Sequence, residues 1–208
     1  NFTTARNLLL SNIGHATIDV TSGNTLTANG AISGNGTLIK SDAGTLIINS
    51  ANTYTGGTTI LGGTLATPGG LGNNSMSSGS INLGGGTFEV MYPPGNGSYY
   101  LFRSDSFNLI AGTNSTILVD TGINLGGLGN INGAGNLTIN ALGNFQNTGN
   151  LNTTGSLTIL GCGTVNLSGI NSYTGQTIIN GGNLLLSGNG SIASSSAVVN
   201  NGTLNISG

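Results

Sequence analysis

The segment that decides the fold reads GTLIINSANTYTGGTTILGGTL at residues 44–65, and a second copy reads GTVNLSGINSYTGQTIINGGNL at residues 163–184. The two copies align without a gap, 119 positions apart. In both, aliphatic residues alternate with Thr, Asn or Ser, and glycines separate the alternating stretches. A period of two is typical of a half-buried strand, and glycine permits the tight bends between strands. The segment therefore predicts short strands joined by turns.

A five-residue phrase extends this pattern along the chain. It consists of a glycine, a small polar residue, an apolar residue, any residue and a second apolar residue. Copies begin at Gly44, Gly86, Gly135, Gly155, Gly163 and Gly202. Apolar residues at helical spacing and good helix formers are both scarce. We therefore expect an all-β protein.

A second self-match has a different offset. Residues 32–38 resemble residues 131–137, which lie 99 positions further on, whereas the two long copies lie 119 positions apart. The two offsets differ by the same 20 positions that separate the phrases at Gly135 and Gly155. An insertion that preserves the pattern on both sides should be one whole structural unit. A unit of this size suits one coil of a parallel β-helix, whose coils stack at the ~4.8 Å strand spacing.

We therefore predict a single β-helical solenoid over residues 1–208, with about ten coils and a length on the order of 50 Å. Its repeat unit A spans about 15–90, a loop-like insertion about 91–107, and repeat unit B about 108–208. Aliphatic side chains should point inward, and Thr, Asn and Ser should form ladders outside. Asn-Gly pairs also suit the hairpins of an antiparallel sandwich, but a sandwich does not explain the clean insertion of one unit.

Composition narrows the possible functions. The chain has 39 Gly and 31 Asn, but only 3 basic and 5 acidic residues, for a net charge of −2. Three basic side chains cannot neutralise a run of phosphates, so we expect no nucleic-acid partner. No apolar run approaches the roughly 18 residues of a membrane span, so we expect no membrane insertion of this segment. The chain begins at Asn1 without Met or a basic and apolar leader, which predicts a processed product or an excerpt.

The long copies resemble the passenger-associated repeat of bacterial autotransporters, whose pattern is roughly GTLTLSGANTYTGGTTVNGGTL. The second copy is looser, because Gln176 replaces a glycine and Asn183 a threonine. The resemblance implies a right-handed parallel β-helix, exported as a passenger through an outer-membrane barrel and exposed at the bacterial cell surface or secreted. It implies no enzymatic activity.

The reactive residues form no evident constellation in the sequence. His15 stands apart from other ligand-type residues, and the acids Asp19, Asp42, Glu89, Asp105 and Asp120 are scattered. We therefore predict no catalytic, metal or cofactor-binding residues and no cofactor. The single cysteine, Cys162, allows no internal disulfide. We expect it to be a small buried residue.

The stretch 91–103 breaks the repeat pattern, because it holds two of the three prolines and a cluster of aromatic residues. Proline cannot donate to a central β-ladder, so this stretch should be a loop that leaves the coil. Tyr, Phe and Arg are frequent in binding interfaces. The candidate contact residues are Tyr92, Tyr99, Tyr100, Phe102 and Arg103. The alternative is a loop packed over its own coils.

The leading hypothesis is a non-catalytic extracellular structural or adhesive rod that contacts ligands on host or neighbouring cell surfaces. A second is the subunit of an extracellular filament, assembled by end-to-end stacking or strand exchange, because β-helix edges can pair with further strands. A third is an ice- or carbohydrate-binding face of Thr and Asn. It is less favoured, because the Thr-x-Thr pairs at 25–27 and 53–55 do not recur at the coil spacing.

Overall fold

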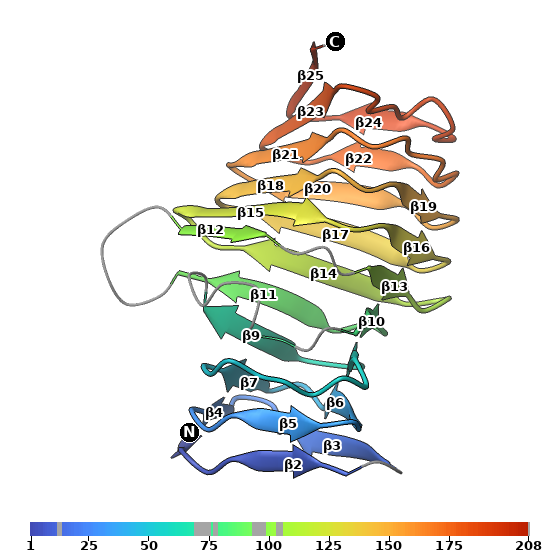
Figure 1. The fold of residues 1–208 in the computed structure, drawn as a ribbon. Helices are drawn as coiled ribbons and strands as arrows, with labels where there is room; N and C mark the ends of the chain where they lie inside the picture. The colour runs from blue at the N-terminus through green and yellow to red at the C-terminus, as the bar shows by residue number, and fades with distance from the viewer. Residues whose placement is uncertain (12–13, 69–75, 77–78, 93–98, 103–105, 208) are drawn as a thin grey trace.

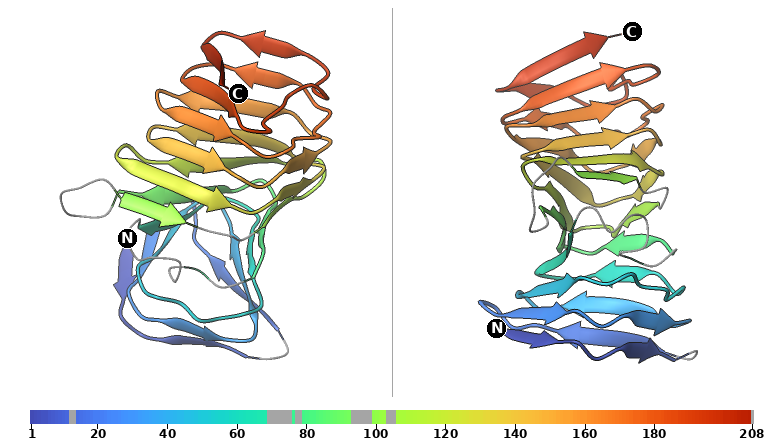
Figure 2. Two further views of the ribbon diagram at one scale, coloured as in Figure 1. Left: turned by 45° about the horizontal axis from the view of Figure 1, so that its top comes forward. Right: turned by 60° about the vertical axis from the view of Figure 1, so that its left-hand side comes forward.

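The computed structural model is a parallel β-helix whose two termini lie at opposite ends of the stack (Figure 1). The structure describes residues 1–11, 14–68, 76, 79–92, 99–102 and 106–207, with the backbone alone for 99–102. No helix occurs in these residues, and neighbouring strands pair in parallel. The predicted all-β solenoid is confirmed. Figure 2 shows the stacked coils from two further sides.

Each coil visits up to three faces in turn. The first face is a ten-stranded sheet that runs through the whole molecule. Its strands are β1 (Phe2–Thr4), β4 (Thr25–Ala28), β7 (Thr45–Ile48), β9 (Thr64–Pro68), β11 (Thr87–Met91), β14 (Asn114–Val119), β17 (Asn136–Ala141), β20 (Leu157–Gly161), β22 (Thr177–Ile179) and β24 (Val198–Asn200).

The second face is occupied by two sheets at different heights. The two-stranded sheet consists of β2 (Leu8–Leu10) and β5 (Ile32–Gly34). The six-stranded sheet consists of β12 (Tyr99–Phe102), β15 (Ile123–Leu128), β18 (Asn144–Asn147), β21 (Thr164–Leu167), β23 (Asn183–Ser187) and β25 (Thr203–Ser207).

The third face is a seven-stranded sheet, from which the chain returns to the first face. Its strands are β3 (His15–Asp19), β6 (Thr37–Ser41), β8 (Thr58–Ile60), β10 (Ile81–Leu83), β13 (Phe107–Leu109), β16 (Ile131–Gly133) and β19 (Leu151–Thr153).

The register of the ten-stranded sheet measures each coil. From strand to strand, the nine steps advance the chain by 24, 20, 19, 23, 29, 22, 20, 20 and 21 positions. Nine steps of about 4.8 Å give a stack of about 43 Å. The longest step, from Phe88 to Ile117, contains the predicted insertion. Most steps therefore lie near the predicted coil length, but that length is not constant.

Register also explains the two sequence offsets. Five coil steps lead from Leu46 in β7 to Ile159 in β20, and the chain then runs on to Val165 on the next face. The offset of 119 positions is thus five coils and one face. The offset of 99 positions, from Leu38 to Leu137, is four coils and one face by the same path. Their difference is one whole coil, as the sequence predicted.

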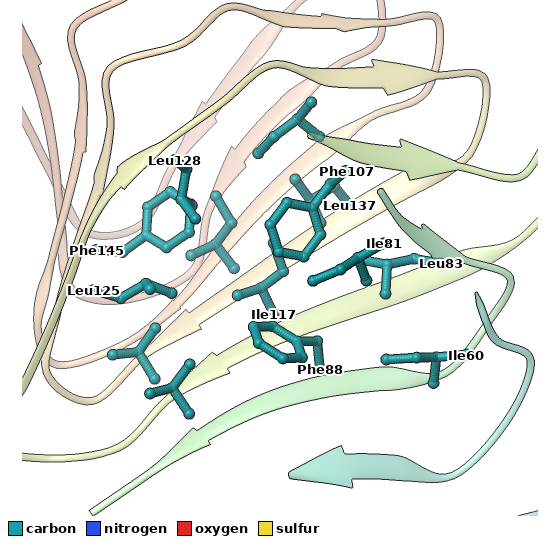
Figure 3. Packing of buried hydrophobic residues seen from close by; sticks show 14 of the residues in the cluster. Ile60, Ile81, Leu83, Phe88, Phe107, Ile117, Leu125, Leu128, Leu137 and Phe145 are labelled. Atoms are coloured by element: carbon teal, nitrogen blue, oxygen red, sulfur yellow. The ribbon is translucent and has the colours of Figure 1, made fainter. Parts of the chain in front are cut away.

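The core is a column of inward-pointing aliphatic and aromatic side chains (Figure 3). On the ten-stranded sheet, Leu46, Leu65, Phe88, Ile117 and Ile139 occupy successive coils at one register position, and all are buried. The rings of Phe88 and Phe107 meet across the core at a centroid distance of 5.6 Å. Alternation along each strand therefore produces the predicted apolar interior.

Glycines stack at the corners because adjacent coils approach too closely for a side chain. A Cβ on Gly155 would overlap the carbonyl oxygen of Gly135, one coil earlier. A Cβ on Gly163 would overlap the carbonyl oxygen of Gly143 in the same way. The glycines that begin the repeated phrases are therefore required by the contact between coils.

Lys40 departs from the predicted pattern, because it points inward from β6 and is fully buried. Its Nζ donates to the carbonyl oxygens of Ser41, Asp42 and Gly62 at 2.6, 2.8 and 3.2 Å. Ser41 ends β6, Asp42 begins the turn that follows, and Gly62 lies in the corresponding turn one coil later. Burial lowers the pKa of Lys40, while the nearby charges of Asp42 and Asp19 oppose that effect. The ammonium group thus joins two turns from within the core.

The prediction for Cys162 is wrong, because its side chain is exposed. The residue lies between Gly161 and Gly163 at the tip of the turn that joins β20 to β21. The strand alternation ends at Gly161, so the tip residue is no longer directed toward the core. Leu142, at the corresponding tip one coil earlier, is exposed for the same reason.

Candidate functional site

The corner between the ten-stranded and six-stranded sheets is where the predicted contact segment leaves the regular coil. Met91 ends β11, and Tyr99–Phe102 form β12, which pairs in parallel with β15. These four residues are therefore part of the ladder, so the prediction that all of 91–103 forms a loop outside the coil is wrong. Tyr and Phe are enriched in strands, so the continuous run Tyr99–Phe102 can form a strand although two prolines precede it in the sequence.

Of the predicted contact residues, only Tyr92 has a described side chain. Tyr99, Tyr100 and Phe102 are placed by their backbone in β12, and Arg103 lies outside the described residues. Tyr92 is 40% exposed. Its backbone N–H donates to Asp120 Oδ2 at 3.0 Å, which holds the start of the segment against the next coil.

A pocket of about 520 Å³ lies at this corner, which we call the Tyr92 corner. It is lined by Tyr92, Asp120, Thr121, Gly122 and Leu142. The Tyr92 ring rests on Gly122, where a Cβ would lie 2.7 Å from Cε2. Gly122 adopts φ +81°, a conformation that favours glycine. The missing side chain at this position therefore makes room for the ring and leaves a recess beside Leu142.

The electrostatic character of the Tyr92 corner is acidic. Glu89 lies on β11, one coil before β14 and the turn that carries Asp120. Burial raises the pKa of the Glu89 carboxyl, and the negative charge of Asp120 raises it further. The stacking of coils thus brings together two acids that stand 31 positions apart in the sequence. The sequence predicted them to be scattered.

A second surface feature went unnoticed in the sequence. The register places seven threonines in one straight column on the outer face of the ten-stranded sheet, one per coil and each partly exposed. They are Thr25, Thr45, Thr64, Thr87, Thr116, Thr138 and Thr158. Their spacing in sequence varies between 19 and 29 positions, so no constant period reveals them. The sequence signal covered only part of the column, because Thr45, Thr64 and Thr87 directly follow a glycine and the other four do not.

The seven-stranded sheet presents asparagines instead. Asn82 donates to Thr59, and Asn108 donates to Asn82 at 3.0 Å. Higher in the same column, Asn152 donates to Asn132 at 3.3 Å and accepts from Ser172 at 2.8 Å. These side-chain amides link successive coils, as the predicted polar ladders require.

The other reactive residues stay apart. His15 is exposed on β3. Within the described ranges, no group of three His, Cys, Asp or Glu side chains could hold a metal ion. In that same part of the chain, no helix is long and apolar enough to cross a membrane.

The two long sequence copies build matching corners. Asn52 Oδ1 accepts from the Ile32 N–H at 2.7 Å, and the buried Tyr54 hydroxyl bonds to Thr58 at 2.7 Å. The backbone N–H of Thr53 donates to the carbonyl oxygen of Ile32. Residues 49–57 thereby cover β5, the last strand of the two-stranded sheet, without forming a strand themselves.

The second copy repeats this arrangement on another face. Asn171 Oδ1 accepts from the Leu151 N–H at 3.0 Å, and the Tyr173 hydroxyl bonds to Thr177 at 2.6 Å. Residues 168–176 cover β19, the last strand of the seven-stranded sheet. In each copy, an asparagine side chain replaces a backbone acceptor and closes the edge of a sheet.

Comparison with known proteins finds similarity in the two regions that contain these corners. The family described as passenger-associated-transport-repeat matches residues 38–66 and 157–186. The adhesin BmaC autotransporter of Brucella suis biovar 1 (strain 1330) is 56% identical over 39 residues, which cover 19% of this chain and 1% of the adhesin. No solved structure matches. Each of these two matched regions contains one Asn–Tyr–Thr corner, at 52–58 and at 171–177, and we call the regions the two transport repeats.

Proposed function

We propose that this chain is a rod-like, non-catalytic segment of a bacterial adhesin passenger, exposed at the cell surface or secreted, that binds ligands on host or neighbouring cells. The observation that carries the proposal is the coincidence of both family matches with the corners that close the sheets. The similarity to an autotransporter adhesin supports it.

The Tyr92 corner is the contact site that we propose. An exposed aromatic ring beside a recess suits recognition, because aromatic side chains contribute much of the energy at binding surfaces. The corner also interrupts the uniform ladders, since the coil that contains it is the longest. In such a rod, the regular outer columns are the scaffold and the irregular Tyr92 corner is the contact point.

Adhesion of coated beads tests this proposal. Beads carrying the purified chain should bind cultured animal cells well above albumin-coated beads. A Tyr92→Ala and Leu142→Ser variant should lose much of that binding. The matched control is Leu61→Ser with Ile110→Ser, two exposed apolar residues at another corner. Binding no stronger than that of albumin would refute the adhesive function, and equal loss in the control would refute the site.

A second proposal is association between copies of the chain into a filament. The side-chain amide bonds between successive coils favour it, because the same ladders can join coils of different molecules. Electron microscopy of the purified chain at high concentration is the test. Rods longer than one stack would support the filament, and uniform single stacks would exclude it.

A further inference from the structure

The chemistry of the residues that line the Tyr92 corner narrows the class of ligand that it can bind. This inference rests on the proposed contact site. The pocket presents one exposed aromatic ring, one exposed aliphatic side chain and one carboxylate. No basic side chain is among its described lining residues, which are Tyr92, Asp120, Thr121, Gly122 and Leu142.

Asp120 keeps one oxygen available. Its Oδ2 accepts from the Tyr92 backbone N–H, and within the described residues no hydrogen bond reaches Oδ1. The residue is only partly buried, so this oxygen remains a hydrogen-bond acceptor at the edge of the recess. A ligand with an N–H donor or a positive charge can approach it without displacing a protein contact.

The two carboxylates at the corner repel one another. Glu89 pairs with Leu118 of the next coil, two residues before Asp120, so the two carboxylates lie on neighbouring coils, where like charges repel. A bound cation relieves this repulsion, whereas a bound anion adds to it. Charge therefore favours a positive ligand.

The basic residues of the chain do not supply that cation within the described structure. Lys40 is buried and held by three carbonyls, and Arg6 lies in the first coil. An aromatic face beside carboxylates attracts an ammonium group through its negative quadrupole, and the carbon atoms around the nitrogen pack against apolar walls. Leu142 and the Tyr92 ring form such walls.

We propose that the Tyr92 corner binds an organic ammonium group that carries methyl or methylene carbons, stacked on the Tyr92 ring and paired with Asp120. The occupant that fits this lining is a choline headgroup, because methyl carbons surround its nitrogen and can pack against the Tyr92 ring and Leu142. Its chemistry is that of a cation with an apolar surface. A sugar without an amino group is not the expected ligand.

Nuclear magnetic resonance of the ¹⁵N-labelled full chain tests the proposal. Choline should shift the amide signals of Gly122 and Leu142, whereas 3,3-dimethylbutan-1-ol, which has the same shape without the charge, should not. A parallel titration with Nα-acetyllysine amide tests the rival ligand, a lysine side chain on a protein surface. Larger shifts with choline than with the lysine derivative would support the headgroup, and larger shifts with the lysine derivative would overturn it.

Variants separate the roles of the side chains. Asp120→Asn keeps an acceptor for the Tyr92 N–H but removes the charge, and it should weaken choline binding about three- to five-fold, as should Tyr92→Leu. The distant control Asp42→Asn should bind choline normally. Equal binding of choline and its neutral isostere, or unchanged binding in Asp120→Asn, would overturn the ligand assignment.

The bead assay keeps this inference distinct from the proposed function. If the chain adheres through the Tyr92 corner but choline and the lysine derivative shift no signals, the ligand class is wrong and the contact site stands. If both probes shift the corner signals but the beads do not adhere, the corner binds ammonium groups and the adhesive function is wrong.

Discussion

The two transport repeats are built from nearly the same sequence but lie on different faces of the rod. The first begins in β6 of the seven-stranded sheet and closes the two-stranded sheet. The second begins in β20 of the ten-stranded sheet and closes the seven-stranded sheet. The motif therefore does not specify a face. It specifies a corner, in which an asparagine ends one sheet and the chain passes to the next.

The surroundings of the two repeats differ in polarity. Within the first repeat, Lys40 points into the core, whereas the residue 119 positions later, within the second repeat, is the aliphatic Ile159. Conversely, Ala28 precedes the first repeat where Asn147 precedes the second. Lys40 is satisfied by three carbonyls, whereas neither polar atom of the Asn147 side chain has a partner among the described residues. Only one of the two buried polar groups is thus paired.

The largest effect is expected where both repeats obey the same constraint. Gly163→Ala would place a Cβ against the carbonyl oxygen of Gly143, and Gly44→Ala would do so against Thr21. Because backbone atoms cannot move aside cheaply, each change should cost about 3 kcal/mol of the free energy of unfolding. Urea denaturation measures this cost. Gly14→Ala, which has open space around it, is the control and should change little.

If Gly44→Ala proved harmless while Gly163→Ala did not, the coils would pack less tightly around the first repeat than the structure indicates. The two repeats would then differ in how tightly their coils pack as well as in the polarity of their surroundings.

The second prediction concerns pH. Burial raises the pKa of Tyr173 to about 12, while its hydrogen bond with Thr177 opposes the shift. The folded pKa of Tyr173 exceeds its unfolded value of about 10. The stability that this difference in pKa contributes is therefore fully present below pH 10. It is lost as the pH rises from about 10 to about 12, by up to about 3 kcal/mol. Urea denaturation across this range measures the loss.

Tyr173→Phe should remove this part of the pH dependence, because phenylalanine has no proton to lose. A variant that loses stability as steeply as the original chain across the same range would show that other groups cause the decline.

The coil and its corners could be predicted from the sequence because they depend on local pattern. The phrases that begin at Gly135 and Gly155 stack one coil apart, as their spacing indicated. The face on which each repeat lies could not be predicted. Offsets count positions along the chain, and coil steps that vary between 19 and 29 positions hide how many faces have been passed.

The candidate site was only partly predictable for a related reason. Tyr92 was chosen for its aromatic character, but its partners Asp120, Gly122 and Leu142 come from later coils. Their proximity depends on register, which a single sequence does not reveal. The predicted burial of Cys162 was wrong for a local reason, because a residue at the tip of a turn does not follow the alternation of the strand.

The third prediction separates the two closing asparagines. Asn52→Ala and Asn171→Ala each leave a backbone N–H without its acceptor, on Ile32 and Leu151 respectively, which costs about 1–3 kcal/mol. Asn52 also donates to Ser50 at 2.9 Å, whereas the Nδ2 of Asn171 has no partner among the described residues. The loss should therefore be larger for Asn52→Ala. Chemical denaturation of the two variants measures the loss of unfolding free energy. A larger loss for Asn171→Ala would contradict the prediction that Asn52 contributes more.

The smallest effect should be a gain in stability. Asn147 is fully buried between Leu128 and Leu167, which occupy its register position in the adjacent coils. Its amide has no partner within the described residues, and a buried polar group without a hydrogen bond costs about 1–3 kcal/mol. Asn147→Leu restores an unbroken apolar column, and leucine has the same branching and the same number of side-chain heavy atoms as asparagine. It should raise the free energy of unfolding by about 1 kcal/mol.

The counterpart of this change is Ala28→Asn, which places a polar group before the first repeat as Asn147 stands before the second. It should lower the free energy of unfolding. If Asn147→Leu instead destabilised the chain, the Asn147 amide would have a partner that offsets its burial, such as an ordered water molecule between coils. The two repeats would then differ in how their polar groups are paired rather than in whether they are paired.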